Sequence, residues 1–173
     1  MPITTTPPAQ DTLSQITIRY ARPDDIPKLA AIEISGAHLF RSATTDLGWI
    51  ADQLPMDPSI LQSMWLAQHL WVAIDSSQDG ADEPVAFLGC TPKDGLSYIE
   101  EVSVHERWQR RGIARRLITA AEEHARTEGF TRVSLTTYRD LRWNGRFYTK
   151  IGFEEVEPWV AGNGHLEAFG GAG

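Results

Sequence analysis

The pattern of apolar and polar positions changes from strand-like to helical within the first third of the chain. Residues 16–20 alternate as a strand does, so we expect a strand there. A proline and two aspartates at 23–25 then open a segment with helical spacing, and proline is tolerated in a first helical turn. Residues 37–68 hold two weaker helical stretches, which Pro55 and Pro58 interrupt.

The middle of the chain is dominated by short apolar runs separated by turn residues. Residues 75–83 are rich in Asp, Ser and Gly, and Lys93-Asp94-Gly95 is a tight hairpin signal. These turns separate three expected strands, at residues 70–74, 84–91 and 97–104. The sequence therefore predicts an antiparallel meander of three strands.

The last third returns to helical spacing and then to further short elements. A helix is expected over residues 112–127, a strand over 132–137 and a short helix over 143–151. Further strands are expected from Gly152, the last of them at 164–169. The resulting order, β-α-α-β-β-β-α-β-α-β-β, predicts an α/β domain built around a mixed sheet.

Length and composition favour one globular domain at residues 15–173. Residues 1–14 are polar and proline-bearing, and we expect them to form a disordered tail. No apolar run is long enough to span a bilayer, and the start lacks the order of a signal peptide, so we expect a cytoplasmic protein without membrane contact. Cys90, the single cysteine, lies in an apolar run and is interpreted as a small buried hydrophobe.

The charge pattern points to a small anionic ligand. The formal net charge is −7, which argues against nucleic acid as a partner, since phosphate backbones are bound by clustered Lys and Arg. The main basic cluster is compact and consists of Arg107, Arg110, Arg111, Arg115 and Arg116. Within an acidic protein, such a cluster favours one small anion over a long polyanion.

The strongest local motif is the loop Gln109-Arg110-Arg111-Gly112-Ile113-Ala114 between the strand at 97–104 and the following helix. A helix N-terminus offers unpaired N–H groups and a partial positive charge, and Gly112 allows the backbone to come close to an anion. The loop matches neither the Gly-x-x-x-x-Gly-Lys-Ser/Thr motif of nucleoside triphosphatases nor the Gly-x-Gly-x-x-Gly motif of dinucleotide-binding proteins. It predicts a cradle for a pyrophosphate.

At this loop the sequence resembles the GNAT superfamily of acyltransferases, whose signature is Gln/Arg-x-x-Gly-x-Gly/Ala after a strand. Gln109, Gly112 and Ala114 match that signature. The resemblance implies that the backbone of residues 109–114 holds the pyrophosphate of acetyl-CoA. It also implies a mixed, mostly antiparallel central sheet flanked by helices, with Val102 and Val104 beside the thioester and the Val104 N–H as donor to the thioester carbonyl.

A second segment, Trp143-Asn144-Gly145-Arg146-Phe147-Tyr148-Thr149-Lys150-Ile151-Gly152-Phe153, looks like the later motif of the same superfamily. The resemblance assigns Asn144 to the pantetheine or phosphate arm and Tyr148 to protonation of the departing thiolate. It covers about residues 16–158 and implies an N-acetyltransferase with acetyl-CoA as co-substrate.

An amine attacks a thioester only as free base, so the site needs a proton acceptor. Counting by twos along the strand places Glu100 on the face of Val102 and Val104, and Glu101 on the other face. Glu100 is therefore the candidate base. A water that Glu100 activates, or simple binding of the ammonium by Glu100, are alternatives.

The expected acceptor is a primary amine of a small or amino-acid-like molecule, bound in a ternary complex. The walls of the acceptor site are expected to include Phe40, Arg41, Trp49 and Trp143. A peptide N-terminus or a lysine remains an alternative acceptor, and a non-catalytic acetyl-CoA sensor is the alternative outside the enzymes.

No metal site is expected, because the histidines show no ligand pair at short spacing: His38, His69, His105, His124 and His165. The last expected strand at 164–169 is followed by only a few residues. We therefore expect it to be incomplete or completed by a second subunit, as in a homodimer.

Overall fold

The computed structural model describes residues 15–170 except 43–46, 78–81 and 139–140, so the expected tail at 1–14 lies outside the described residues. The strands are β1 (Ile16–Tyr20), β2 (Leu70–Asp75), β3 (Pro84–Lys93), β4 (Leu96–Val104) and β5 (Val133–Leu135). The α-helices are α1 (Ile26–Ala37), α2 (Pro58–Leu66), α3 (Ile113–Thr127), α4 (Arg142–Lys150), α5 (Pro158–Ala161) and α6 (Asn163–Gly170). Short 3-10 turns are η2 (Pro23–Asp25), η3 (His38–Ser42), η4 (Gly48–Asp52) and η5 (Glu106–Trp108).

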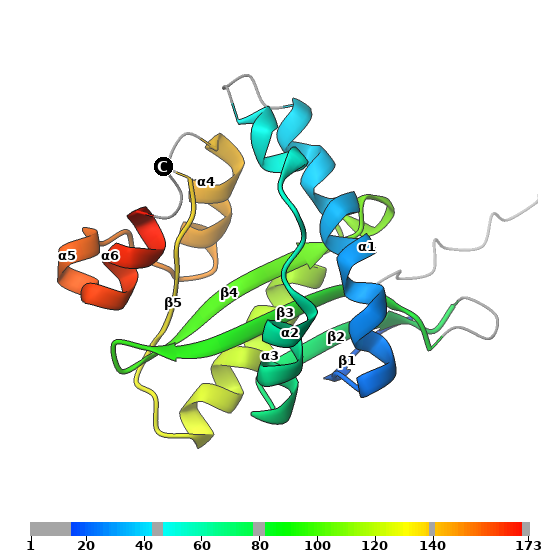
Figure 1. Ribbon diagram of the computed structural model, residues 1–173, viewed down its shortest axis with the longest axis horizontal. Helices are drawn as coiled ribbons and strands as arrows, with labels where there is room; N and C mark the ends of the chain where they lie inside the picture. Colours follow the sequence, from blue (N-terminus) through cyan, green and yellow to red (C-terminus); the bar gives the residue numbers. More distant parts are fainter. Residues whose placement is uncertain (1–14, 43–46, 78–81, 139–140, 171–173) are drawn as a thin grey trace, which may run out of the picture.

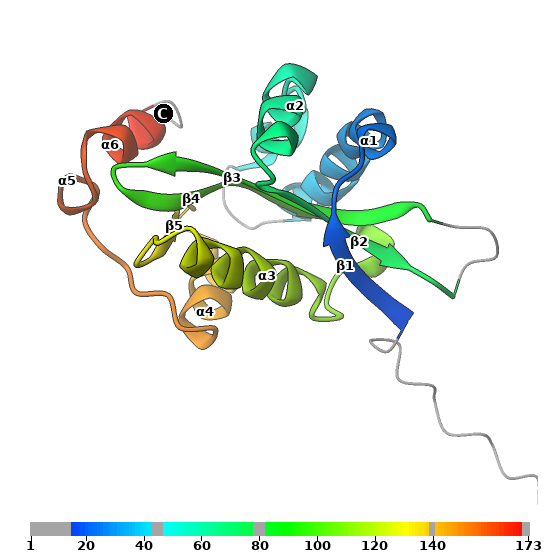
Figure 2. The ribbon, with the colours of Figure 1, turned by 90° about the horizontal axis from the view of Figure 1, so that it is seen from below.

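The strands form one five-stranded sheet in the order β1-β2-β3-β4-β5, antiparallel except for the parallel pair β4–β5. Helices α1 and α2 cover one face, and α3 and α4 cover the other (Figure 2). This three-layer arrangement confirms the expected α/β fold and the expected meander. Within the described residues, no helix has both the length and the apolar character that a membrane span requires.

The sheet carries an apolar core on each face. On the α3 face, Leu88 and Leu117 are fully buried, and on the α1 face, Leu29 and Phe87 are fully buried. Cys90 belongs to the α3-side core with 2% of its surface exposed, and burial raises the pKa of its thiol to about 12. Its interpretation as a buried hydrophobe is confirmed.

A β-bulge interrupts the alternation of β4. Gly89 pairs with Glu101 and Cys90 pairs with Ile99, so Glu100 is an extra residue on β4. Beyond the bulge Val102 and Val104 pack on the α3 face together with Ile99. Counting by twos through residue 100 was therefore wrong: Glu100 does not share the face of the two valines, because one inserted residue reverses the phase of a strand.

Strands β4 and β5 pair over only three residues each and then diverge (Figure 1). The last pair is Ile99 with Leu135, and β5 is shorter than the expected strand at 132–137. The second half of β4, from residue 100 to Val104, therefore has β3 on one side and, among the described residues, no paired strand on the other.

The expected strands after Gly152 are absent from the described residues; the chain there forms α5 and α6 instead. Helix α6 starts on the β3–β4 hairpin, where Asp94 accepts the backbone N–H groups of Gly164 (3.1 Å) and His165 (2.9 Å). The segment contains Leu166, Glu167 and Ala168, which favour helix, and the carboxylate pairs the first N–H groups of the helix. The reason given for a homodimer, an incomplete strand at 164–169, is therefore removed.

Candidate active site

The loop that follows β4 is held in place by several side chains of its own. The Trp108 indole N–H donates to Oδ2 of Asp75 at 2.9 Å, and the Arg107 guanidinium lies 5.4 Å from the centre of the Trp108 ring. Nδ1 of His105 accepts the backbone N–H of Arg107 at 3.2 Å. These contacts fix the path of the chain from β4 to α3.

Gln109 joins the loop to both neighbouring elements. Its side-chain amide donates to the carbonyl oxygen of Val104 at 3.1 Å and to that of Gly36 at 3.4 Å. A Cβ atom at Gly36 would lie 2.9 Å from the Val104 oxygen, so α1 crosses the end of β4 at a distance that only glycine permits. The expected phosphate loop is thus anchored at the junction of α1 and β4.

The start of α3 has the properties of an anion cradle. The N-cap of α3 is Gly112, which has φ +76° and no side chain that could pair with the first N–H groups of the helix. Arg110 also has a positive φ, of +61°. The first N–H groups of an α-helix have no partner within the helix. Arg110, Arg111 and Gly112 are exposed, whereas Ile113 is 1% exposed and anchors the helix in the core. Open N–H groups therefore face solvent beside positive side chains.

The free edge of β4 offers backbone donors next to this cradle. His105 donates its N–H to Val85 on β3 at 2.9 Å. Backbone groups along a strand point alternately to its two neighbours. The N–H groups of Val104 and Val102 consequently point away from β3, toward the side from which β5 has diverged.

Tyr148 lies on α4, half-buried between two phenylalanines. Its ring centre is 5.1 Å from that of Phe147 and 5.6 Å from that of Phe153, in tilted edge-on contacts. Burial, with a further contribution from the charge of Glu101, raises the pKa of Tyr148 to about 12. The phenol therefore stays protonated at neutral pH, which is the form that a general acid needs.

Asn144 lies in the first turn of α4 and is tied to the chain that continues from β5. Its side-chain amide donates to Oγ1 of Thr137 at 2.8 Å. The bond positions α4, and with it Tyr148, relative to the diverging strand.

Two acidic side chains meet on the α1 face of the sheet. Burial, and next the charge of Glu33, raises the pKa of Glu101 to about 7, although the Ser103 hydroxyl donates to Glu101 at 2.6 Å. Burial also raises the pKa of Glu33, which accepts the Met56 N–H at 2.9 Å. The structure thus contains a carboxyl group poised to change protonation near neutral pH.

Glu100, the base expected from the sequence, has other partners. Its carboxylate accepts the Thr91 hydroxyl at 2.5 Å and lies 3.3 Å from the Lys93 ammonium. Both partners belong to β3, close to the hairpin turn at Asp94.

The expected acceptor walls lie in three different elements. Phe40 and Arg41 are in η3, and Arg41 is paired with Asp52 of η4 at 2.5 Å. Trp49 of η4 meets Tyr138 edge-on, with 6.1 Å between ring centres, so the α1–α2 connection lies beside the chain that follows β5. Trp143 is exposed on α4.

A family model accounts for most of the chain. The model of the acetyltransferase (GNAT) family matches residues 37–153, more than half of the 173 residues. The chain belongs to the acetyltransferase (GNAT) family. The resemblance inferred from the two motifs is confirmed, and with it the enzyme class, an acetyl-CoA-dependent acyltransferase.

Solved structures with this GNAT fold include enzymes with different acceptors. The PaiA N-acetyltransferase from Thermoplasma acidophilum in complex with coenzyme A has a TM-score of 0.66 and 16% identity, over 83% of this chain and 91% of that one. The NatC complex bound to Gag peptide and CoA has a TM-score of 0.64 and 16% identity, over 83% and 87%. An aminoglycoside acetyltransferase from an uncultured soil metagenomic sample, in complex with sisomicin, has a TM-score of 0.58 and 21% identity, over 83% and 93%.

In this GNAT acetyltransferase the residues named from the two motifs lie on β4, in the loop between β4 and α3, in the first turn of α3 and on α4. Sequence reasoning missed Glu33, Glu101 and Tyr138. Glu101 was given no role because the bulge at Glu100 is set by pairing with β3 and cannot be read from the sequence, and Glu33 and Tyr138 carry no local signal that distinguishes them from other polar or aromatic residues.

Proposed function

We propose that the chain transfers the acetyl group of acetyl-CoA to a primary amine of a small-molecule or amino-acid-like acceptor, by direct attack in a ternary complex. The observation that carries the proposal is the unpaired edge of β4 beyond Ile99, which holds Glu101 and is followed by the exposed glycine start of α3. An acid and a base whose environments hold their pKa values far apart are the pair that acyl transfer to an amine requires.

The cradle at residues 109–114 fits the pyrophosphate of acetyl-CoA. The N–H groups of Gly112, Ile113 and Ala114 would hold its oxygens, with Arg110 and Arg111 supplying charge and Gln109 fixing the loop. Val102 would bind the extended arm through its outward N–H and C=O groups and Val104 through its N–H, since the Val104 carbonyl oxygen accepts the Gln109 amide, and Asn144 would line the path of the arm from α4. The exposure of Arg110, Arg111 and Gly112 supports this fit.

Glu101, in place of Glu100, is the proposed base. It takes the proton that the acceptor ammonium must lose before the amine nitrogen bonds to the acetyl carbon. The Val104 N–H donates to the carbonyl oxygen as negative charge develops there. As the carbon–sulfur bond breaks, Tyr148 supplies a proton to the departing thiolate sulfur.

The acceptor side favours a cationic molecule. Glu33 and Glu101 place two carboxyl groups on the α1 face, and Trp49 and Tyr138 add aromatic surface where the α1–α2 connection meets the chain that follows β5. Ammonium groups bind to both kinds of surface. The similar structures hold an aminoglycoside in one case and a peptide in another, and both ligands carry amines.

The test is a panel of amines, amino acids, aminoglycosides and short peptides with acetyl-CoA, followed by release of free thiol. We expect the largest rate with a small primary amine or amino-acid-like compound. Tyr148→Phe should lower kcat by about 10² to 10⁴-fold, the usual contribution of a general acid, and leave acetyl-CoA affinity nearly unchanged. A Tyr148→Phe enzyme as fast as wild type would remove this residue from the mechanism.

Gly112→Glu should abolish coenzyme A binding in calorimetry by placing bulk and negative charge in the cradle. Gly129→Glu is the matched control, because Gly129 also has positive φ (+87°) and its Cβ position has nothing within 4 Å, but it lies at the other end of α3. Unchanged affinity in a folded Gly112→Glu protein would refute the cradle. Tight coenzyme A binding without thiol release from any amine would favour the sensor.

A further inference from the structure

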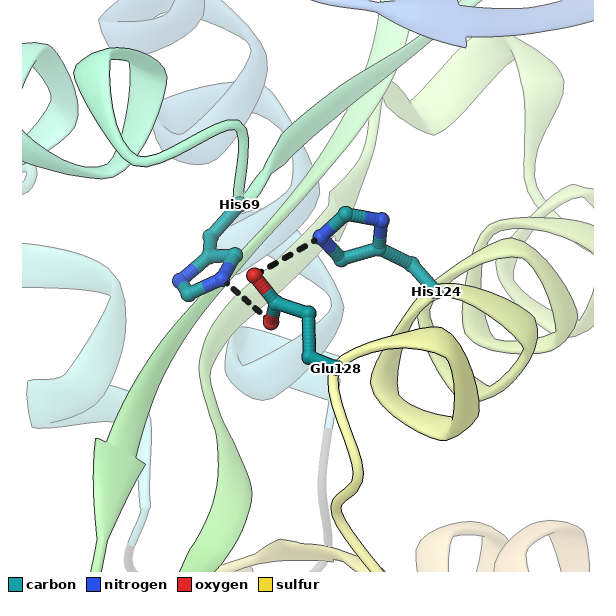
Figure 3. A group of neighbouring side chains, drawn as sticks. All are labelled: His69, His124 and Glu128. Carbon is teal, nitrogen blue, oxygen red and sulfur yellow. Dashed lines mark hydrogen bonds and ion pairs between the residues drawn. The ribbon is translucent and has the colours of Figure 1, made fainter.

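Three potential metal ligands converge on the α3 face of the sheet, away from the proposed acyl-transfer site. His69 directly precedes β2, His124 lies in the last turn of α3, and Glu128 caps the end of that helix. One ligand atom from each lies within 4.8 Å of the other two. Figure 3 shows both imidazole rings directed at the Glu128 carboxylate.

His69 and Glu128 already share a hydrogen bond, and the three ligand atoms are close enough for a cation to take its place after a small separation of the two side chains. Nε2 of His69 lies 2.7 Å from Oε2 of Glu128, and Nε2 of His124 lies 3.4 Å from Oε1. The two carboxylate oxygens thus face one imidazole nitrogen each. Two histidine nitrogens and one carboxylate are a ligand set typical of Zn²⁺, with a fourth position left for water.

Nε2 of His124 is buried and lacks a hydrogen-bond partner. Among the described residues it is the one buried side-chain nitrogen or oxygen without a hydrogen-bond partner. A buried polar atom without a partner is costly. A cation between this nitrogen and the Glu128 oxygen would satisfy both atoms.

The surroundings of His124 fix its ring as a ligand. Nδ1 lies 2.8 Å from the Tyr20 hydroxyl, and when Nδ1–H donates to that oxygen, Nε2 carries the lone pair that a metal needs. The rings of Tyr20, His69 and Trp71 surround the imidazole at centre distances of 5.8, 5.5 and 5.5 Å. Outer partners of this kind orient metal-binding histidines.

The ligands are also accessible enough to load. The side chains of His69 and His124 are 11% and 16% exposed, and that of Glu128 is 34% exposed. A cation can therefore enter on the Glu128 side and end between two nearly buried rings.

We propose that His69, His124 and Glu128 bind one divalent transition-metal ion of the Zn²⁺ type, oriented by Tyr20. The ion joins the end of α3 to β2 and, through Tyr20, to β1. It lies about 16 Å along α3 from the cradle, at 1.5 Å per residue. The site is therefore structural, and its loading should stabilise the fold without entering the acyl transfer.

The experiment starts from protein stripped of metal with a chelator and titrates it with ZnCl₂ by calorimetry. Wild type should bind one equivalent and melt at a higher temperature with Zn²⁺ than without, since a ligand that binds only the folded state stabilises it. With Co²⁺ in place of Zn²⁺, the protein should show the visible absorption of a four-coordinate site.

His124→Gln and Glu128→Gln should each weaken Zn²⁺ binding by more than about 100-fold, and Tyr20→Phe by about 10-fold, the scale expected for an outer partner. His38→Gln is the matched control, because His38 lies 3.4 Å from Glu106 in an exposed pair that has no third ligand among the described residues, and this variant should bind Zn²⁺ as wild type does. Coenzyme A affinity verifies that each variant is folded.

Failure of wild type to take up one equivalent of Zn²⁺, or equal Zn²⁺ affinity in wild type and a folded Glu128→Gln protein, would overturn the proposal. Glu128 is the most exposed of the three ligands, so its conservative replacement keeps the test valid even if His124→Gln does not fold.

Discussion

The ionised form of Glu101 should favour catalysis but lower the stability of the fold. Its pKa of about 7, raised from 4.5 mainly by burial, makes it a competent base at neutral pH but an unfavourable buried charge. Because the folded pKa lies above the unfolded one, the folded state binds more protons between these two pH values, and stability falls as pH rises through that window.

We therefore predict two opposite effects of Glu101→Gln. The rate at neutral pH should fall by about 10² to 10⁴-fold, with loss of the rise in kcat/KM near pH 7. Stability at pH 8 should increase, by up to about 3 kcal/mol for a pKa change from 4.5 to about 7. Rate profiles and thermal melts over pH 5–9 measure both.

Glu100→Gln is the control in these measurements, since it has the same chemistry one residue away. It should keep the pH profile of wild type, because Glu100 is engaged with Thr91 and Lys93. A profile altered by Glu100→Gln and not by Glu101→Gln would restore the base expected from the sequence.

At the residue scale, the sequence predicted the local order of elements and was wrong about the face of Glu100, which depends on strand pairing. Gly112 and Gln109 stood out because a strand, a glycine loop and a helix follow one another directly, an order that the structure confirms. Glu100 and Glu101 are chemically identical neighbours, and only the register against Gly89 and Cys90 separates them. No property of the β4 sequence alone marks the bulge.

Helix α6 depends on one carboxylate at the tip of a hairpin. Asp94 accepts two N–H groups of α6 and lies 2.7 Å from Nδ1 of His165, whose Nε2 lies 2.8 Å from the Ser134 hydroxyl. The bond with His165 and those with the two N–H groups lower the pKa of Asp94. A carboxyl with a lowered folded pKa stabilises above its unfolded value, and this contribution is lost as pH falls below about 4.

We predict that Asp94→Ala exposes residues 158–170 to limited proteolysis at neutral pH, and that wild type becomes similarly sensitive in acid. Mass spectrometry of the fragments reports the cleavage sites. Asp57→Ala is the control, because Asp57 caps α2 in the same manner through the Ser59 N–H at 2.7 Å. Cleavage confined to 158–170 only in the Asp94 variant is the expected result; equal resistance of wild type and Asp94→Ala would contradict it.

At the element scale, the meander was predicted well because its turns and alternation are local signals. The C-terminal segment was predicted as strand, and it is helical because its first turn meets Asp94, some 70 residues earlier in the chain. A segment of eight residues carries too little periodicity to reveal such a contact.

At the scale of the whole molecule, basic and acidic side chains are concentrated in different places. The net charge is −7, yet five arginines cluster in and around the cradle, at positions 107, 110, 111, 115 and 116, whereas Glu33 and Glu101 lie on the proposed acceptor side. Steering of a cation by such a field weakens as salt shortens the screening length, to about 10 Å at 0.1 M.

We predict that kcat/KM for cationic acceptors falls with added NaCl, and falls more steeply for an acceptor with several ammonium groups than for a monoamine. Initial rates at saturating acetyl-CoA over a salt series measure the two slopes. Equal slopes for the two acceptors would show that the acidic field plays no part in their capture.

Cys90 should not react with thiol reagents while the protein is folded. It is the single cysteine, it is 2% exposed, and its pKa is raised to about 12, so almost none of it is thiolate at neutral pH. Colour from a disulfide-exchange dye during turnover therefore counts released coenzyme alone. The same dye, added to enzyme without substrate, reports the rate of global unfolding, because Cys90 reacts only when the sheet and α3 separate.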